Sequence, residues 1–472
     1  MCAFRKLTYI VSLCFSQMIW AGAQSEKPNV VIVLGDDISS NTIGCYGSLN
    51  PNTTPNIDRL ATEGVQFTNM FVAQATCAPT RAELYTGLRP FHNGTYMNHR
   101  PAKTGTKSMT HHLGELGYRV GLAGKVHVRP KSVYDFEYLS GFQKNCNHFG
   151  PAKDNWDQVE QFMTRDQEQP FCLVLASTHA HAPWDAGDSS HWKLDDVVLP
   201  PALVDTPETR SYFREYLAEV REFDRQVGDT RAMLQKHGLD KNTVLIVLDE
   251  NGIGMPGGKW TNYDWGVRSA CVMKLPSTYN KPMKTSVIAQ YCDVLPTLIE
   301  LAGGEVPEGL DGKSLVKVLR GEAETHREYA YFVNNAETPN TPFSSRAITD
   351  GRYKLIWTLT PENPFVSLTI NGFQFGFKDR MEDRHVRKMF QSWQREEENN
   401  AHAEEMIRRF ETRPEFQLFD LDADPGEMKN LANNREYVSI CESLLIQLKR
   451  IMEEQDDLGS DCYGKGRKQA KK

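Results

Sequence analysis

Four short apolar runs, each followed directly by polar residues, constrain the fold of this chain more than any other feature. They cover residues 30–34, 120–123, 171–176 and 244–248, and helix-compatible stretches separate them. Runs of this length and composition are typical of strands buried on both faces of a parallel sheet. The alternation predicts an α/β fold in which helices cover both faces of the sheet.

The polar segments directly after these runs indicate where a site would form. They are Asp36-Asp37, Gly124 to His127, Ser177 to His181, and Asp249 to Gly252. In open parallel sheets, ligands bind beyond the carboxyl ends of the strands. We therefore expect these segments to converge on one site wherever the strands are neighbours.

Length and charge narrow the class of protein. A chain of 472 residues, 40% hydrophobic and 24% charged, can bury a large core, and we expect a catalytic domain over 24–340 and a C-terminal subdomain over 341–472. The net charge of -7 gives no general attraction to nucleic acid or to anionic membranes. An anionic ligand would need locally placed cations.

Residues 1–23 have the pattern of a signal peptide. Arg5 and Lys6 precede a mostly apolar stretch, which ends in the small residues 21–23. The stretch is short and interrupted by polar residues, so export is favoured over a membrane anchor, and we expect no stable membrane insertion. This pattern predicts a secreted or periplasmic location. Export permits disulfides, but spacing does not decide whether Cys441 and Cys462 pair or remain free thiols.

Beyond about residue 340 the pattern changes to that of a small α+β unit. We expect a hairpin over 347–357 with its turn at Asp350-Gly351, a strand over 415–421 and a terminal helix over 437–454. Residues 380–411 are heavily charged, which predicts a helical segment with a solvated face. A long structural helix is expected earlier, over 206–237, and the tail 465–472 is expected to be disordered.

The acids after two of the runs suit a hard metal ion. Asp36, Asp37 and Glu250 offer three carboxylates, and Asn251 adds an amide oxygen. Such an oxygen set favours calcium or magnesium over zinc. Like charges so close would repel unless a cation lay between them.

A second group of residues surrounds Cys77. Pro79 suits the first turn of a helix, which places Cys77 at the helix N-terminus, where N–H groups and the helix dipole favour an anion. Arg81 comes two residues later. Taken alone, this stretch is also compatible with a buried cysteine beside a surface arginine.

The stretch from Cys77 to Arg81, which continues to Thr86-Gly87, resembles the sulfatase signature Cys-x-Pro-x-Arg, in which the cysteine is converted to formylglycine (3-oxoalanine). Further segments resemble the same family over most of the chain. They are 43–47, 52–60, the Gly-Lys-x-His motif at 124–127, the His-x-Pro motif at 181–183, Lys259, and the C-terminal segments 351–355 and 418–431. Details such as Phe91 to Gly94 and Tyr263-Asp264 resemble the branch that contains heparan N-sulfatase.

This resemblance implies an alkaline-phosphatase-like fold with a large, mixed but mostly parallel sheet, and one Ca²⁺ ion, to which Mg²⁺ is a less favoured alternative. The implied metal ligands are Asp36, Asp37, modified Cys77, Glu250 and Asn251. Relatives usually have Ser-Asp where this chain has Asp249-Glu250. Asp249 therefore remains an alternative ligand.

The resemblance also implies roles for the surrounding side chains. Hydrated formylglycine would attack sulfur, and His181 or Lys259 would protonate or neutralise the leaving oxygen. His127 would take a proton from the second hydroxyl, while Arg81 and Lys125 would hold formylglycine and offset charge on the sulfate.

The expected substrate is a sulfated sugar of a glycosaminoglycan or algal polysaccharide, with Asn98, His99 and Arg100 as sugar contacts. Whether an N–S or an O–S bond is cut stays open. A formylglycine-generating enzyme or an anaerobic sulfatase-maturating enzyme is an implied partner. Two alternatives remain: a phosphonate monoester or phosphodiester hydrolase of the same superfamily, and a non-catalytic protein that binds sulfated glycans.

Overall fold

The computed structural model describes residues 27–144, 146, 154–276, 282–336, 342–375 and 384–465. The predicted signal peptide over 1–23, the predicted domain boundary at 340/341 and the tail beyond 465 lie outside these residues. None of the described helices combines the length and the apolarity that crossing a bilayer requires.

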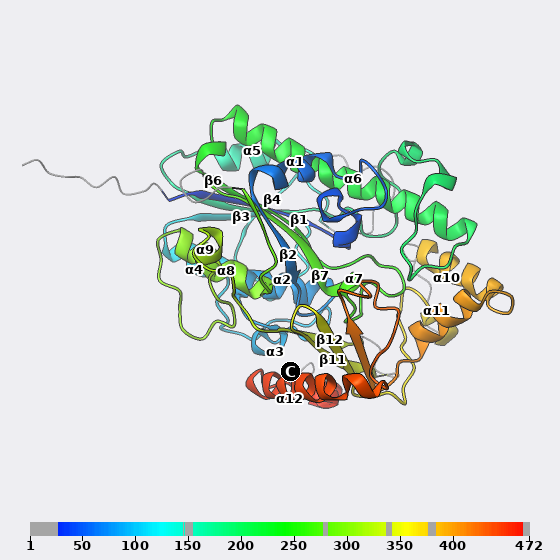
Figure 1. Ribbon diagram of the computed structural model, residues 1–472. Coiled ribbons are helices and arrows are strands. Elements are labelled where there is room, and N and C mark those ends of the chain that lie inside the picture. The colour runs from blue at the N-terminus through cyan, green and yellow to red at the C-terminus, as the bar shows by residue number, and fades with distance from the viewer. Residues whose placement is uncertain are drawn as a thin grey trace, which may run out of the picture.

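The larger of two sheets has nine strands among the described residues and is mostly parallel (Figure 1). Its order is β4-β3-β5-β1-β6-β7-β2-β8, and β9 pairs with β2. The strands are β1 Asn29–Gly35, β2 Val65–Phe71, β3 Arg119–Gly124, β4 Glu137–Leu139, β5 Phe171–Ala176, β6 Thr243–Asp249, β7 Arg268–Lys274, β8 Met283–Thr285 and β9 Ala289–Gln290. The four predicted strands are β1, β3, β5 and β6, and they lie together, as expected.

Alternate residues of β1 enter two separate cores, which is why the sheet needs a layer of helices on each face. Val30, Ile32 and Leu34 face one core, together with α2 Cys77–Thr86, α4 Met109–Glu115, α8 Val294–Leu301 and α9 Val316–Leu319. Val31 and Val33 face the other, together with α1 Pro55–Glu63, α5 Asp157–Thr164 and α6 Pro207–Lys236. The predicted three-layer α/β architecture is confirmed.

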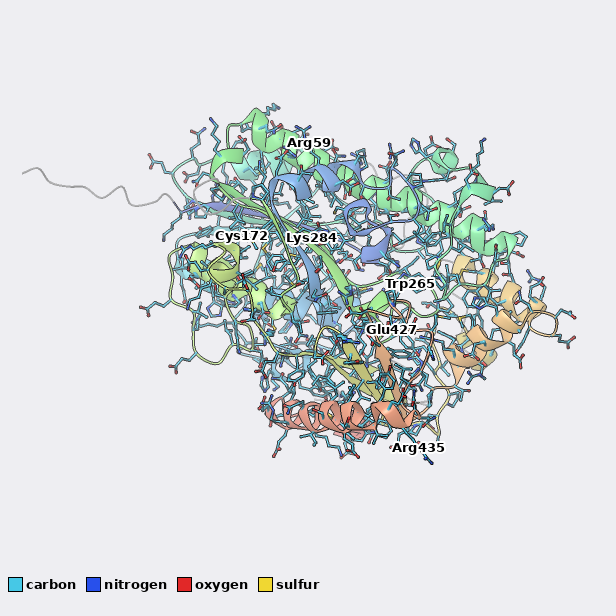
Figure 2. All side chains as sticks on the ribbon, in the orientation of Figure 1. Arg59, Cys172, Trp265, Lys284, Glu427 and Arg435 are labelled. Atoms are coloured by element: carbon cyan, nitrogen blue, oxygen red, sulfur yellow. The ribbon has the colours of Figure 1, made fainter. Side chains whose placement is uncertain are left out.

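The second sheet is antiparallel, in the order β10-β11-β12-β13. Its strands are β10 Ala330–Asn335, β11 Ser344–Thr349, β12 Tyr353–Thr358 and β13 Phe416–Asp420, and α12 Val438–Glu454 packs on it. The hairpin turn at Asp350-Gly351 is confirmed, with Gly351 at φ +97°. Arg59 on α1 and Arg435 just before α12 lie on opposite sides of the molecule (Figure 2).

The charged segment 380–411 contains two helices, α10 Arg384–Glu396 and α11 Ala401–Glu411. The prediction of helices is confirmed, but only the outer side of these helices is exposed to solvent. Trp393 is fully buried, and its indole N–H donates to Thr209 of α6 at 2.9 Å. An apolar stripe at helical spacing lies within the charged sequence, and the core beside α6 covers it.

The disulfide alternative for Cys441 and Cys462 is not realised, because both are free thiols in the structure. Cys462 is buried beside Ser344 and Asn335 of the second sheet. Cys441 lies on α12.

Burial of Trp393 generates a stability prediction. Trp393→Ala should lower the free energy of unfolding by about 3–5 kcal/mol, because it leaves a large cavity between α10 and α6. Lys388→Ala, at an exposed position of the same helix, should change it by less than about 0.5 kcal/mol. Urea denaturation measures both, and equal effects would show that α10 does not pack as described.

Candidate active site

Strand register brings the predicted polar segments to one edge of the larger sheet. Ala176 at the end of β5 pairs with both Leu34 of β1 and Gly124 of β3. Gly35 pairs with Asp249, at the end of β6. The segments that begin at Asp36, Lys125, Ser177 and Glu250 therefore leave the sheet side by side, as the sequence predicted.

The nucleophile segment reaches the same edge by a route that the sequence did not reveal. β7 runs antiparallel to β6, and β2 runs antiparallel to β7, so β2 points the same way as β1. Its carboxyl end leads to α2, which begins at Cys77. The helix N-terminus thus faces the polar cluster, where its dipole favours negative charge.

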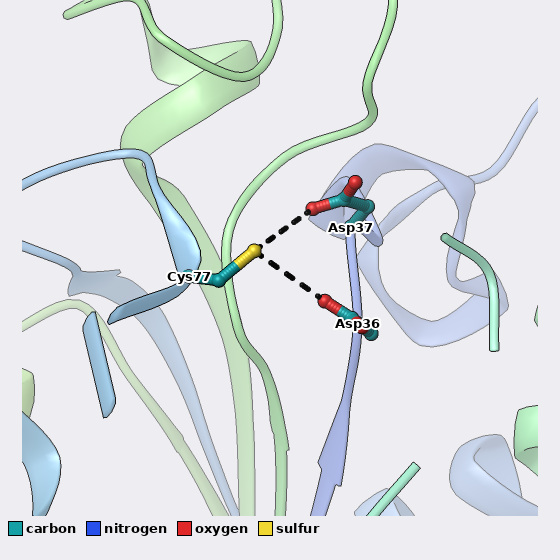
Figure 3. Close-up of side chains that lie close together, drawn as sticks. All are labelled: Asp36, Asp37 and Cys77. Carbon is teal, nitrogen blue, oxygen red and sulfur yellow. Dashed lines mark hydrogen bonds between the residues drawn. The ribbon is translucent and has the colours of Figure 1, made fainter. Parts of the chain in front are cut away.

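Cys77 points at the two predicted acids (Figure 3). Its sulfur lies 3.8 Å from Asp36 Oδ1 and 4.0 Å from Asp37 Oδ1. One ligand atom from each of the three residues lies within 4.8 Å of the others, so together they form a group that could hold a metal ion. Burial raises the pKa of the Cys77 thiol to about 12, so the unmodified side chain is neutral near pH 7.

Two lysines complete the centre of the cluster. Lys259 Nζ donates to both Asp37 Oδ2 and Cys77 Sγ at 2.9 Å. Lys125 Nζ donates to Asp36 Oδ2 at 2.6 Å. Burial would raise the pKa of both aspartates, but the lysines hold each pKa below its usual range. Both carboxylates are therefore charged, and each faces a cation.

Glu250 lies in the cluster with its carboxylate held by Arg81. Arg81 donates from Nε and Nη2 to the two oxygens of Glu250, at 2.7 and 2.9 Å, and from Nη1 to the backbone oxygen of Lys125. Lys125 Nζ is 3.9 Å from Glu250 Oε2. Both members of the Arg81–Glu250 pair have no exposed side-chain surface. Arg81 thus acts on the site by fixing Glu250 and the Lys125 backbone.

Asn251 offers the cluster an unused oxygen. Its Nδ2 donates to Asp37 Oδ1 and to the Gly252 oxygen, both at 2.9 Å. Its buried Oδ1 has no hydrogen-bond partner among the described residues. An orphaned amide oxygen beside two carboxylates fits the donor set of a hard divalent cation.

Asp249, the alternative ligand, turns away from the cluster. Its Oδ1 accepts from the Ala270 backbone N–H at 2.6 Å and from the Ser269 hydroxyl, both on β7. Burial raises its pKa well above the usual range. Asp249 therefore stabilises the contact between β6 and β7 and does not face Asp36 and Asp37.

The predicted histidines reach the site from two sides. His181 Nε2 lies 3.6 Å from Asp37 Oδ2, and its Nδ1 donates to the Ala182 oxygen at 2.6 Å. Burial lowers the pKa of His181, and burial together with Lys125 lowers that of His127 to about 2. Both imidazoles are therefore neutral near pH 7.

Asn98 and His99 join the site through a chain of hydrogen bonds. Ala78 N–H donates to Asn98 Oδ1 at 3.2 Å, so the Asn98 amide N–H faces His99 Nε2 at 3.2 Å. His99 Nδ1 lies 2.9 Å from His127 Nε2. This network sets His99 as the donor and His127 as the acceptor.

Arg100, the third predicted sugar contact, turns elsewhere. It donates to the Gly94 oxygen at 3.0 Å, and its guanidinium lies over the Tyr96 ring at 4.3 Å.

The backbone carries a further mark of a functional site that no sequence pattern indicated. Asp37, His99, His127 and Trp260 have φ of 56°, 60°, 46° and 61°. Non-glycine residues rarely adopt these values, and such strain concentrates at functional sites.

Two side chains of the site region were given no role from the sequence, although one of them, His179, lies in the predicted segment Ser177 to His181. Cys146 donates to Asp36 Oδ2 at 3.2 Å. Buried His179 pairs with Glu219 of α6, and this pair raises the pKa of His179 against the effect of burial. Neither residue belongs to a motif that would have identified it.

The arrangement is that of a hydrolase site: a cysteine at a helix N-terminus, beside paired acids and lysines at the carboxyl edge of an α/β sheet. Comparison with known proteins identifies the family. The sulfatase family model matches residues 28–304, and the chain belongs to the sulfatase family. It is a sulfuric ester hydrolase. A second model, N-sulphoglucosamine sulphohydrolase, C-terminal, matches residues 258–365.

Two curated relatives illustrate the similarity. An ulvan-active sulfatase of Formosa agariphila is 31% identical over 467 residues, which cover 98% of this chain and 87% of the relative. Human N-sulphoglucosamine sulphohydrolase is 23% identical, with 93% of each chain covered.

Solved structures share the fold at lower identity. One is a protein in complex with its substrate D-glucosamine-2-N,6-O-disulfate, which matches with a TM-score of 0.70 and 20% sequence identity. The match covers 92% of this chain and 99% of that protein. Phosphonate monoester hydrolase of Agrobacterium radiobacter matches with a TM-score of 0.68 and 16% sequence identity. The match covers 91% of this chain and 96% of the hydrolase.

The Arg81–Glu250 pair generates a prediction. Arg81→Met should lower the free energy of unfolding by about 3–5 kcal/mol, because it removes the guanidinium that is hydrogen-bonded to both oxygens of the buried Glu250 carboxylate. Adding Glu250→Gln should restore part of the loss. Arg59→Met, which breaks an exposed pair with Glu63, should cost at most about 1 kcal/mol. Denaturant unfolding of the four proteins checks this, and equal losses in the two single variants would contradict it.

Proposed function

We propose that this sulfatase removes sulfate from a sulfated carbohydrate, and that formylglycine made from Cys77 is its nucleophile. The observation that carries the proposal is the position of Cys77. It begins α2, and its sulfur contacts Lys259 and faces Asp36 and Asp37. A neutral thiol with a pKa of about 12 is a weak nucleophile there. Conversion to an aldehyde hydrate would supply a hydroxyl at the same place.

We further propose that the site holds one Ca²⁺ ion. Asp36, Asp37, Asn251 and Glu250 would hold it together with the modified side chain at position 77. The orphaned Asn251 oxygen and the all-oxygen protein donor set support calcium, with magnesium less suited. When bound, a divalent cation would lower the pKa of a coordinated hydroxyl.

The side chains around residue 77 have separate proposed roles in the reaction. Lys259, in contact with the reacting atom of residue 77, can offset negative charge on the sulfate and the leaving oxygen. His181 lies on the Asp37 side, and because its Nδ1–H is held by the Ala182 oxygen, it would first bind a proton at Nε2 and then pass that proton to the leaving group. We assign His127 the removal of a proton from the second hydroxyl, which requires its Nε2 to exchange the His99 N–H for that hydroxyl. Lys125 and Arg81 hold Asp36 and Glu250 in place.

The sugar would contact the rim that contains Asn98 and His99, with Arg100 beside it. The ulvan-active relative and the N-sulphoglucosamine sulphohydrolase relative support an acidic polysaccharide or glycosaminoglycan as the source of the substrate. The proposal covers both sulfate esters and sulfamates. Export through the predicted signal peptide and modification by a formylglycine-generating or anaerobic sulfatase-maturating enzyme belong to the same proposal.

Peptide mass spectrometry and product analysis test the proposal together. The peptide that contains residues 77–81 should show formylglycine at position 77, and the protein should release sulfate from ulvan or heparan-derived oligosaccharides. Cys77→Ala should lower the release by at least about 10³-fold, because it removes the side chain that carries the proposed nucleophile.

The rival functions predict other results. Faster turnover of an aryl phosphodiester than of any sulfate would favour a phosphonate monoester or phosphodiester hydrolase, which shares the fold. Tight glycan binding without sulfate release, with unmodified Cys77, would favour a non-catalytic binding protein.

Metal removal gives an independent prediction. Ca²⁺ added to chelator-treated protein should raise the melting temperature, since a ligand that binds the folded state stabilises it. Asp37→Asn should abolish this shift, and Asp422→Asn, at an exposed position, should preserve it. Differential scanning calorimetry measures the shift, and an equal shift in both variants would place the ion elsewhere.

A further inference from the structure

A second cavity, of about 520 Å³, lies between the larger sheet and the C-terminal subdomain. None of the predicted catalytic or metal-binding residues lines it. Figure 2 labels three lining residues from distant parts of the sequence: Trp265 of α7 (Asp264–Val267), Lys284 of β8, and Glu427 beyond β13. The volume falls within the roughly 300–1,000 Å³ of small-molecule sites, which favour such junctions.

The cavity adjoins the active site through one segment. Lys259 points to Cys77, whereas Gly257 and Trp265 of the same segment line the cavity. The Trp265 backbone oxygen accepts from the Ser39 hydroxyl, two residues beyond Asp37. The cavity therefore shares the segment around 257–265 with the site at Cys77, although none of the predicted catalytic residues lines it.

The buried acids of the cavity are already paired. Asp264 Oδ2 accepts from Arg268 Nε at 2.7 Å, and Asp264 Oδ1 pairs with buried Lys354. Glu427 accepts from the Asp264 backbone N–H at 2.5 Å, and its Oε1 lies 3.4 Å from Lys354 Nζ. The exposed acid of the lining, Asp422, lies 3.7 Å from Arg352 Nε, so each of the three lining carboxylates faces a cation.

Two cations of the cavity are not paired in this way. Arg409 is half-buried over the Tyr263 ring, 4.5 Å from its centroid, and it donates to Met428 Sδ at 3.8 Å. Lys284 is exposed on β8. Within the described part of the chain, neither forms an ion pair with a carboxylate. A guanidinium positioned by an aromatic ring, with N–H groups still available, suits a carboxylate or sulfate.

The rest of the lining suits a sugar. Half-buried Tyr46 and Trp265 line the cavity with aromatic side chains, and the exposed side chains of Asn41 and Ser286 provide neutral hydrogen-bonding groups. Rings with a polar edge combine apolar contact with hydrogen bonding, as the face and hydroxyls of a sugar require. The two unpaired cations, Lys284 and Arg409, favour a sugar that carries negative charge.

We propose that this cavity is a second, non-catalytic binding site for an acidic disaccharide unit of the glycan, a proposal that rests on the substrate class proposed above. Binding there would raise the effective concentration of the polysaccharide beside Cys77. Turnover of a small sulfate would gain nothing from it.

Binding to the Cys77→Ala protein tests the proposal without turnover. Isothermal titration with ulvan and with heparan sulfate identifies the tighter polymer. Lys284→Gln and Arg409→Gln should each weaken its binding about tenfold, which is the loss expected from one charge-assisted contact. Arg408→Gln, on the exposed side of α11, is the matched control and should bind as the parent does. Unchanged binding in both cavity variants, or no binding of either polymer, overturns the proposal.

Kinetics separates a binding site from a structural effect. In Lys284→Gln, whose exposed position cannot disturb the core, kcat/KM for the polymer divided by kcat/KM for 4-nitrophenyl sulfate should fall about tenfold, mainly through KM. An unchanged ratio overturns the proposal. If the parent releases no sulfate from either compound, the proposed function fails, and the titrations alone decide whether the cavity binds glycan.

Discussion

Three carboxylates and three cations, all nearly inaccessible to solvent, oppose one another at the carboxyl edge of the larger sheet: Asp36, Asp37, Glu250, Arg81, Lys125 and Lys259. Removing each charge from water costs several kcal/mol, and only close opposite charges with good hydrogen bonds offset that cost. Each of the three carboxylates accepts at least one hydrogen bond from one of these cations. The strained backbone of Asp37 and the register of β1 with its neighbours serve this requirement.

The same charges explain how the site can be both stable and reactive. The charges of the three carboxylates and the three cations cancel, so a divalent cation would give the cluster a net positive charge. A sulfate group together with an ionised nucleophile could bring the net charge back to zero. The N-terminus of α2 adds positive potential at residue 77. The segment from Gly252 to Val267 carries Lys259 on the catalytic side and lines the second cavity with Trp265. The cluster around Cys77 and the second cavity therefore share one stretch of chain.

The predictable parts of the molecule have local signals. Continuous apolar runs mark β1, β3, β5 and β6, because strands buried on both faces cannot tolerate polar residues. β2, with the sequence Val-Gln-Phe-Thr-Asn-Met-Phe, carries no such run, so the strand that delivers Cys77 was not recognised. Cys146 was missed because no fixed spacing relates it to the site. His179 lies in a predicted polar segment, but its pairing with Glu219 was missed because that residue is 40 positions away, on α6. The inner face of α10 was missed because its charges conceal the stripe around Trp393.

By itself, the sequence determined the four central parallel strands, the sites where they end, and the chemical groups of the segment around Cys77, since these depend on neighbours along the chain. Only the tertiary structure decided which of two adjacent acids enters the site. Successive side chains at a strand end point to opposite sides, and the register with β7 directs Asp249 to Ala270 and leaves Glu250 to Arg81. That choice depends on partners 21 and 169 residues away in the sequence, and no local pattern encodes it.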